Sequence, residues 1–72
     1  MTRDELIRRL RRLARRRRVA FEVARDRGKG DHWLVQFGPR RQPVPGAKGR
    51  DLASGTLHSI LRNLGLSERD LE

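Results

Sequence analysis

The sequence contains no cysteine, one methionine and few aromatic residues. Without cysteine, neither a disulfide framework nor a thiolate metal site is available, which favours the cytoplasm. No apolar run approaches the roughly 18 residues that a membrane span needs, and the N-terminus lacks the apolar segment of a signal peptide. A chain of 72 residues has room for one small domain with a thin core. We therefore expect a single domain over residues 1–72, cytoplasmic and without membrane association.

Acidic residues are also scarce. Nine Asp and Glu stand against 18 Lys and Arg, which gives a formal net charge of +9. All but two of the basic residues are arginine, whose planar guanidinium matches phosphate through paired hydrogen bonds. A codon preference for arginine and a solvated basic surface explain the same composition, but the arginines are clustered. The composition therefore favours a nucleic acid or an acidic protein as partner.

The first 18 residues have the pattern of a capped amphipathic helix. Thr2 and Glu5 fit a capping box, and Met1 and Leu6 stand where a hydrophobic staple lies. Apolar residues then follow at helical spacing; they are Leu6, Ile7, Leu10, Leu13 and Ala14. The helix ends in a run of four arginines, Arg15, Arg16, Arg17 and Arg18. We expect the apolar face to enter the core and these arginines to bind phosphate, with a merely solvated surface as the alternative.

A period of two after this helix predicts three strands. The first covers Val19–Arg25 and the second Trp33–Phe37, joined by a turn over Gly28–Asp31. The third covers Arg40–Val44, and its prolines restrict it to a sheet edge. If the aromatic residues of the second strand face the core, the preceding His32 lies on the open face of the sheet.

A second helix is predicted over Ser54–Leu64 from an apolar stripe at i, i+3, i+4 and i+7. Gly65 stands at the position after its C-cap, and Leu66 follows as a Schellman motif requires. Residues 67–72 are expected to form at most a frayed turn. The predicted fold class is α+β in the order α-β-β-β-α, with a three-stranded antiparallel sheet and both helices on one face.

His32 is the candidate catalytic residue, because it follows the glycine turn and imidazole exchanges protons readily near neutral pH. Successive N–H groups of a turn and nearby cations together form an anion site; the candidates here are Arg27, Lys29 and Gly30. His58 is expected to be exposed or to face RNA, and Trp33 is interpreted as a core residue rather than a base-stacking platform. Two separated histidines do not form a metal motif, so no metal or cofactor is expected.

The last third of the chain resembles the C-terminal signature of HicA-type toxins. The matching stretches are Val44-Pro45, Asp51-Leu52, Gly55-Thr56-Leu57-His58-Ser59-Ile60-Leu61 and Gly65-Leu66. Asp4-Glu5-Leu6-Ile7 resembles the first helix of that family, and Gly30-Asp31-His32 resembles its Gly-Ser-His element. The resemblance implies a double-stranded-RNA-binding-domain-like fold, cleavage of mRNA, and neutralisation by a HicB-type antitoxin. Cleavage of RNA needs no metal, because its own 2′-hydroxyl can attack the adjacent phosphorus once a base accepts the proton.

Under this resemblance, His32 takes the position of the catalytic histidine and Gly30 that of the glycine before it. Two residues depart from the pattern: Asp31 stands where the family has serine, and Ala47 stands where many relatives have a second histidine. His32 therefore has a carboxylate neighbour and no auxiliary imidazole. A non-catalytic basic module that binds RNA or an acidic partner, and a toxin homologue with a decayed site, stay open as alternatives.

Overall fold

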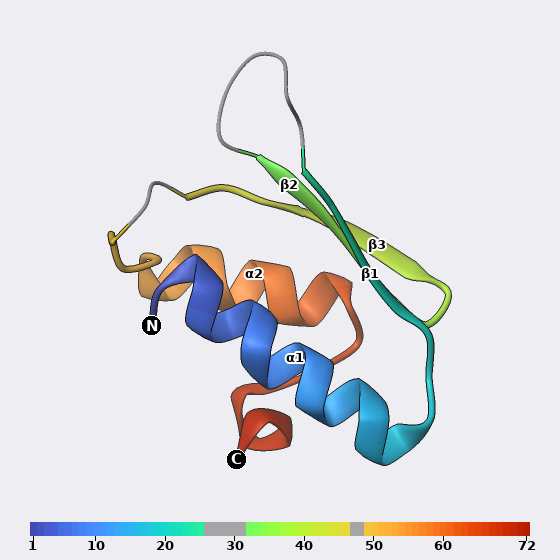
Figure 1. Cartoon of the computed structure of the whole chain (residues 1–72). Helices are drawn as coiled ribbons and strands as arrows, with labels where there is room; N and C mark the ends of the chain where they lie inside the picture. Colours follow the sequence, from blue (N-terminus) through green and yellow to red (C-terminus); the bar gives the residue numbers. More distant parts are fainter. Residues whose placement is uncertain (26–31, 47–48) are drawn as a thin grey trace.

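The computed structural model describes residues 1–25, 32–46 and 49–72. Its elements, in chain order, are α1 (Arg3–Arg17), β1 (Phe21–Arg25), β2 (Trp33–Phe37), β3 (Arg40–Val44), α2 (Ser54–Asn63) and a short 3₁₀ helix, η1 (Glu68–Leu71). The strands form one antiparallel sheet in the order β1-β2-β3, and both helices lie against the same face (Figure 1). The predicted α-β-β-β-α order and the α+β class are confirmed.

The core fills the space between this face of the sheet and the two helices. From the sheet it takes Val35, Phe37 and Val44; from the helical segments it takes Leu6, Ile7, Leu10, Leu13, Ala14, Leu57, Ile60, Leu61 and Leu64. Full burial of one such large apolar side chain contributes about 1.5–3 kcal/mol. The opposite face of the sheet carries the alternate residues of each strand, and these are mostly exposed.

Helix α1 begins at the residue that the sequence indicated. The Thr2 hydroxyl accepts a hydrogen bond from the Glu5 N–H at 3.2 Å, which satisfies one of the free donors of the first turn. The Glu5 carboxylate pairs with Arg9, one turn further on, at 3.1 Å. The predicted capping box is therefore wrong in its second half, because the guanidinium offers this carboxylate a charged partner.

The end of α1 shortens the first strand. Arg18 takes a left-handed conformation with φ 56°, and the Val19 N–H bonds back to the Ala14 carbonyl at 3.0 Å. This is a Schellman ending on a residue other than glycine, which costs roughly 1 kcal/mol of strain. Because the cap uses the Val19 N–H, β1 begins at Phe21, two residues later than predicted.

Helix α2 ends as predicted. Gly65 has φ 77°, its N–H bonds to the Arg62 carbonyl at 3.0 Å, and the Leu66 N–H bonds to the Leu61 carbonyl at 2.7 Å. These two bonds define the Schellman motif. In the described ranges, neither helix is long and apolar enough to cross a membrane.

Residues 68–71 form η1 in place of the frayed turn expected from the sequence. Ser67 caps it, donating from its backbone N–H to Asp70 Oδ2 at 2.8 Å. Arg17 donates to Asp70 Oδ1 at 2.7 Å, and Leu71 is buried. The hydrogen bond from the Ser67 backbone, and after it the Arg17 guanidinium, hold the pKa of Asp70 below its usual value. The expectation was wrong because the stabilising partner lies 53 residues away in sequence.

Candidate functional site

His32 is exposed and lies immediately before β2. Alternation along the strand puts it on the same side as Leu34, the open face of the sheet. The register places Leu34 between Ala24 of β1 and Pro43 of β3. These residues, His32 and Arg25 line a shallow hollow of about 320 Å³. Ala24, Leu34 and Pro43 belong to the face of the sheet that the helices leave open.

A second hollow, of about 370 Å³, reaches His32 from the segment that precedes α2. Arg50, Asp51 and Thr56 are among its lining residues. The Asp51 carboxylate is paired with the N-terminal ammonium at 3.1 Å, so it is already engaged. His32 therefore lies where two hollows meet, with Arg25 lining one and Arg50 lining the other. An exposed imidazole with an arginine in the lining of each adjoining hollow offers the kinds of group that proton exchange beside a bound phosphate needs.

Trp33 fixes the start of β2 at this site. The guanidinium carbon of Arg3 lies 3.6 Å from the centroid of its ring, and that of Arg25 lies 4.6 Å from it. Arg3 is buried, and its Nη1 donates to the Gly46 carbonyl at 3.0 Å. Trp33 itself is half-buried and packs against the edge of the core. The two stacked arginines therefore hold the residue that follows His32.

Sequence reasoning missed Arg3 and Arg25. Arg3 gives no local signal, since it is one arginine in an arginine-rich helix. Arg25 did carry a signal: β1 and β2 pair with Arg25 opposite Trp33, and directly paired residues share a face of the sheet. Pairing the first two predicted strands symmetrically about the turn between them places Arg25 opposite Trp33 from the sequence alone.

The four arginines predicted to bind phosphate do not share one environment. Arg17 is paired with Asp70, and Arg16 donates to the Asp70 carbonyl at 3.3 Å. Arg15 and Arg18 instead line a different hollow, of about 340 Å³, together with Arg11, Ala14, Val19 and Phe21. The structure brings Arg15 and Arg18 together and turns Arg16 and Arg17 toward η1.

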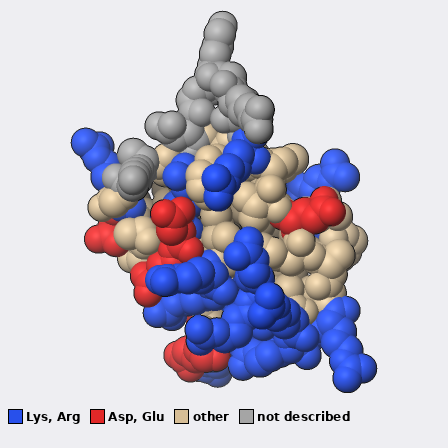
Figure 2. Space-filling view, in the orientation of Figure 1, with Lys and Arg blue, Asp and Glu red and all other residues tan. Residues whose placement is uncertain are grey.

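Basic side chains gather over α1 in the space-filling view (Figure 2). On the flank that faces the C-terminus, arginines and carboxylates are mixed: Glu5, Arg8, Arg9, Arg12 and Glu72 line one hollow. Much of the positive charge on that flank is therefore offset locally.

The remaining candidate residues are placed as follows. Arg27, Lys29 and Gly30, together with Asp31 and Ala47, lie outside the described residues. His58 is exposed on α2, as expected, and its Nε2 lies 3.4 Å from Glu68 Oε1. In the part of the chain that the structure covers, no three His, Cys, Asp or Glu side chains are grouped to hold a metal ion.

No family model, curated protein or solved structure matches this chain. The resemblance to HicA-type toxins therefore enters below as a hypothesis about function.

Proposed function

We propose that this chain is a metal-independent endoribonuclease of the HicA toxin type, which cleaves mRNA in the cytoplasm with His32 as its general acid–base residue. The observation that carries the proposal is the position of His32, exposed at the meeting point of two hollows that each contain an arginine. The net charge of +9 supplies a general attraction for the RNA backbone, which weakens as salt rises.

The reaction needs no group beyond those of RNA, protein and solvent. The neutral imidazole of His32 accepts the proton of a ribose 2′-hydroxyl as its oxygen forms a bond to the adjacent phosphorus. The bond from phosphorus to the 5′-oxygen then breaks, and that oxygen takes a proton from solvent. The products are a 2′,3′-cyclic phosphate and a 5′-hydroxyl.

Arg25 suits the stabilisation of charge that builds up on the phosphoryl oxygens. It lines a hollow with His32, whereas its guanidinium stacks on Trp33, which faces the other side of the strand from His32. Arg25 therefore has to leave the Trp33 ring to bring its charge to a phosphate beside His32. Arg27 and Lys29, the cations predicted from the sequence, are proposed to add to this charge.

The test is cleavage of a single-stranded RNA by the purified chain, with product ends identified by mass spectrometry. We expect a cyclic phosphate end, activity that survives EDTA, and no cleavage when the 2′-hydroxyl at the scissile site is replaced by hydrogen. His32→Gln is expected to lower the rate by about 10²–10⁴-fold. His58→Gln is the matched control, because His58 is exposed on a different surface. RNA binding without cleavage by the wild-type chain would replace this proposal with a non-catalytic RNA-binding module.

A HicB-type antitoxin is the proposed protein partner. The open face of the sheet exposes Leu34 beside His32, so a partner that covers this face buries both. Carboxylates on that partner speed association with a basic chain, while apolar contacts prolong the complex. We expect the complex to protect His32 from diethyl pyrocarbonate. Full reactivity of His32 in a neutralised complex contradicts inhibition by occlusion.

A further inference from the structure

We propose that the hollow between the C-terminal half of α1 and β1 is a binding site for the sugar–phosphate backbone of single-stranded RNA, separate from the His32 site. We call it the basic hollow; it consists of Arg11, Ala14, Arg15, Arg18, Val19 and Phe21. That the bound strand is RNA rests on the proposed function. That a binding site exists here rests on the arrangement of these residues.

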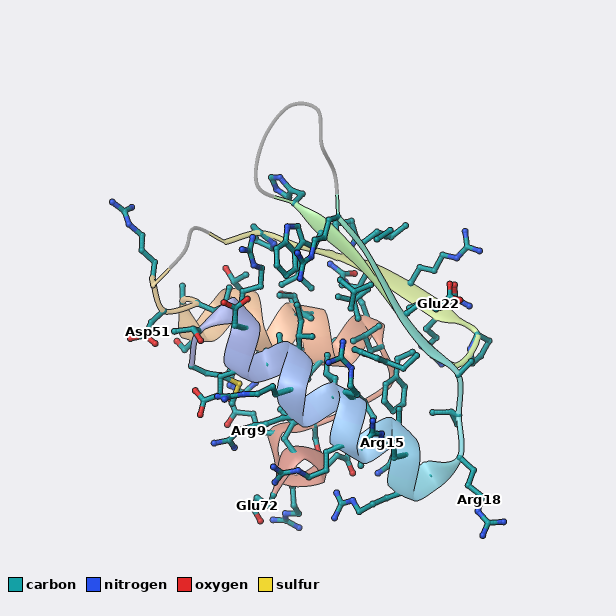
Figure 3. All side chains as sticks on the ribbon, in the orientation of Figure 1. Arg9, Arg15, Arg18, Glu22, Asp51 and Glu72 are labelled. Carbon is teal, nitrogen blue, oxygen red and sulfur yellow. The ribbon has the colours of Figure 1, made fainter. Side chains whose placement is uncertain are left out.

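The three arginines of the basic hollow form one flank at the end of α1. Arg11 and Arg15 have the i, i+4 spacing that places side chains on one face of a helix, and Arg18 follows in the left-handed C-cap. All three line the hollow, so they can engage more than one phosphate of a bound strand. Figure 3 shows Arg18 extending from the end of α1, away from the body of the protein.

No carboxylate of the described residues lines the basic hollow. Among the described residues, these three arginines make no ion pair, whereas Arg9 and Arg17 on the rest of the helix each have a carboxylate partner. Glu22 is the acidic residue closest in sequence, but it follows Phe21 in β1 and so faces the other side of the sheet. The charge of this flank is therefore left for a ligand.

The helix dipole alone does not account for this flank. The C-terminal end of a helix carries about half a negative charge, which a single cation offsets. The last turn of α1 already contains Arg16 and Arg17 beside Arg15. The charges of Arg11, Arg15 and Arg18 thus exceed what the helix end requires.

Three of the residues that line the basic hollow, Ala14, Val19 and Phe21, are apolar. Phe21 is half-buried, Val19 is 36% exposed, and the Arg11 guanidinium carbon lies 5.7 Å from the centroid of the Phe21 ring. A lining that combines apolar side chains with cations suits a nucleotide, whose base has an apolar π face and whose phosphate is charged. A polymer of carboxylates alone, such as polyglutamate, leaves the apolar lining uncovered, so this lining favours RNA over such a polymer.

The basic hollow and the His32 site lie at opposite ends of β1. Phe21 begins this strand and Arg25 ends it, and four steps along an extended strand cover about 13 Å. β1 is an edge strand of the sheet, so a bound strand can pass along it from one site to the other. We infer that the basic hollow holds the RNA several nucleotides away from the bond that is cut.

The test compares two triple variants with the same change in charge. The first is Arg11→Gln, Arg15→Gln and Arg18→Gln in the basic hollow. The control is Arg8→Gln, Arg9→Gln and Arg12→Gln, whose arginines share their hollow with Glu5 and Glu72. Binding is measured by fluorescence anisotropy against a 2′-O-methyl oligonucleotide, which cannot be cleaved, over a series of salt concentrations. Circular dichroism checks that both variants fold.

Each lost phosphate contact to single-stranded nucleic acid lowers the slope of log affinity against log salt by about 0.7. We expect this slope to be smaller by about 2 in the first variant than in wild type. A tenfold dilution of salt would then raise the affinity of the variant roughly a hundredfold less than it raises that of wild type. The control is expected to lose much less. Equal losses in the two variants overturn the proposal, and so does equally strong competition by polyglutamate of the same total charge. Because the ligand is not cleaved, a failure of the His32 mechanism leaves this result unchanged.

Discussion

Replacing Arg3 with methionine is expected to destabilise the fold, although Arg3 is one of 16 arginines on the surface and in the core of a strongly basic chain. Arg3 is 8% exposed, so its environment differs from that of every other arginine on α1. Its Nη1 donates to the Gly46 carbonyl at 3.0 Å, and its guanidinium stacks on Trp33 at 3.6 Å. Methionine keeps an unbranched apolar side chain with similar rotamer entropy, so the change in the free energy of unfolding reports on the loss of the guanidinium group.

The magnitude follows from three contributions. A hydrogen bond from a charged donor contributes about 1.5–3 kcal/mol, and a partly desolvated cation–π contact contributes about 0.5–2 kcal/mol. Removing a cation from the first turn of a helix returns about 0.3–1 kcal/mol, because the helix N-terminus is positive. We expect a net loss of about 3 kcal/mol, which lowers Tm by roughly 12–24 °C in a domain of this size.

The assay is urea and thermal unfolding, followed by tryptophan fluorescence and by far-ultraviolet circular dichroism. Trp33 is the single tryptophan of the chain, so fluorescence reports on the contact itself, and agreement of the two signals checks two-state behaviour. Arg8→Met is the matched control: Arg8 is exposed on the same helix, and its loss is expected to cost less than about 0.5 kcal/mol. Equal stability losses in the two variants, or none in Arg3→Met, refute the reasoning.

Four further predictions follow from single contacts. Asp70→Asn is expected to lower the free energy of unfolding at pH 7 and to make it depend less on pH in the acid range. The pKa of Asp70 is lower in the folded than in the unfolded state, so the ionised carboxylate stabilises the wild-type fold at pH values above the unfolded-state pKa of about 3.9, and this stabilisation is lost as the pH falls below it. An acid titration of urea midpoints measures this, and parallel profiles for the two proteins contradict it. Arg18→Gly raises unfolding free energy by roughly 0.5–1 kcal/mol, because φ is 56° at this position; Arg18→Ala, which retains the strain, is the control in the same melts. Gly65→Ala lowers unfolding free energy by at least about 1 kcal/mol, because φ is 77° and a Cβ would lie 3.1 Å from Arg40 Nε; an unchanged Tm counts against this. Arg25→Gln is expected to lower kcat for RNA cleavage by about 10²-fold or more and, because Arg25 also stacks on Trp33, to lower unfolding free energy by about 0.5–1 kcal/mol; a lowered Tm with kcat intact would instead show a purely structural role.

Most of the fold was predictable because its signals are local. The apolar spacing in both helices, the alternation in the strands and the Gly65-Leu66 ending of α2 each depend on residues within one or two turns of each other. The errors arise where a local signal has two possible partners. Glu5 pairs with Arg9 and not with the Thr2 backbone, and Val19 completes the α1 cap and does not begin a strand.

The candidate site was predictable only in part. Alternation along β2 predicts that His32 shares a face with Leu34, and this argument uses only local sequence. The second hollow, which joins His32 to the segment at the start of α2, depends on tertiary packing. The division of Arg15 and Arg18 from Arg16 and Arg17 depends on Asp70, more than 50 residues further along the chain. Nothing within a run of four arginines indicates which of them contacts a residue as distant as Asp70.

The candidate sites and the hydrophobic core consist largely of different residues. The guanidiniums of the basic hollow and the imidazole of His32 lie outside the core, so substitutions there can change RNA binding or chemistry while the free energy of unfolding stays nearly constant. Trp33 is the exception, since it packs against the core edge and also stacks on Arg25, a residue that lines the His32 hollow. In a domain with one thin core, the strand that supports the catalytic candidate is also part of the folding unit. Loss of the Trp33 ring is therefore expected to reduce stability and cleavage together, whereas loss of His32 reduces cleavage alone.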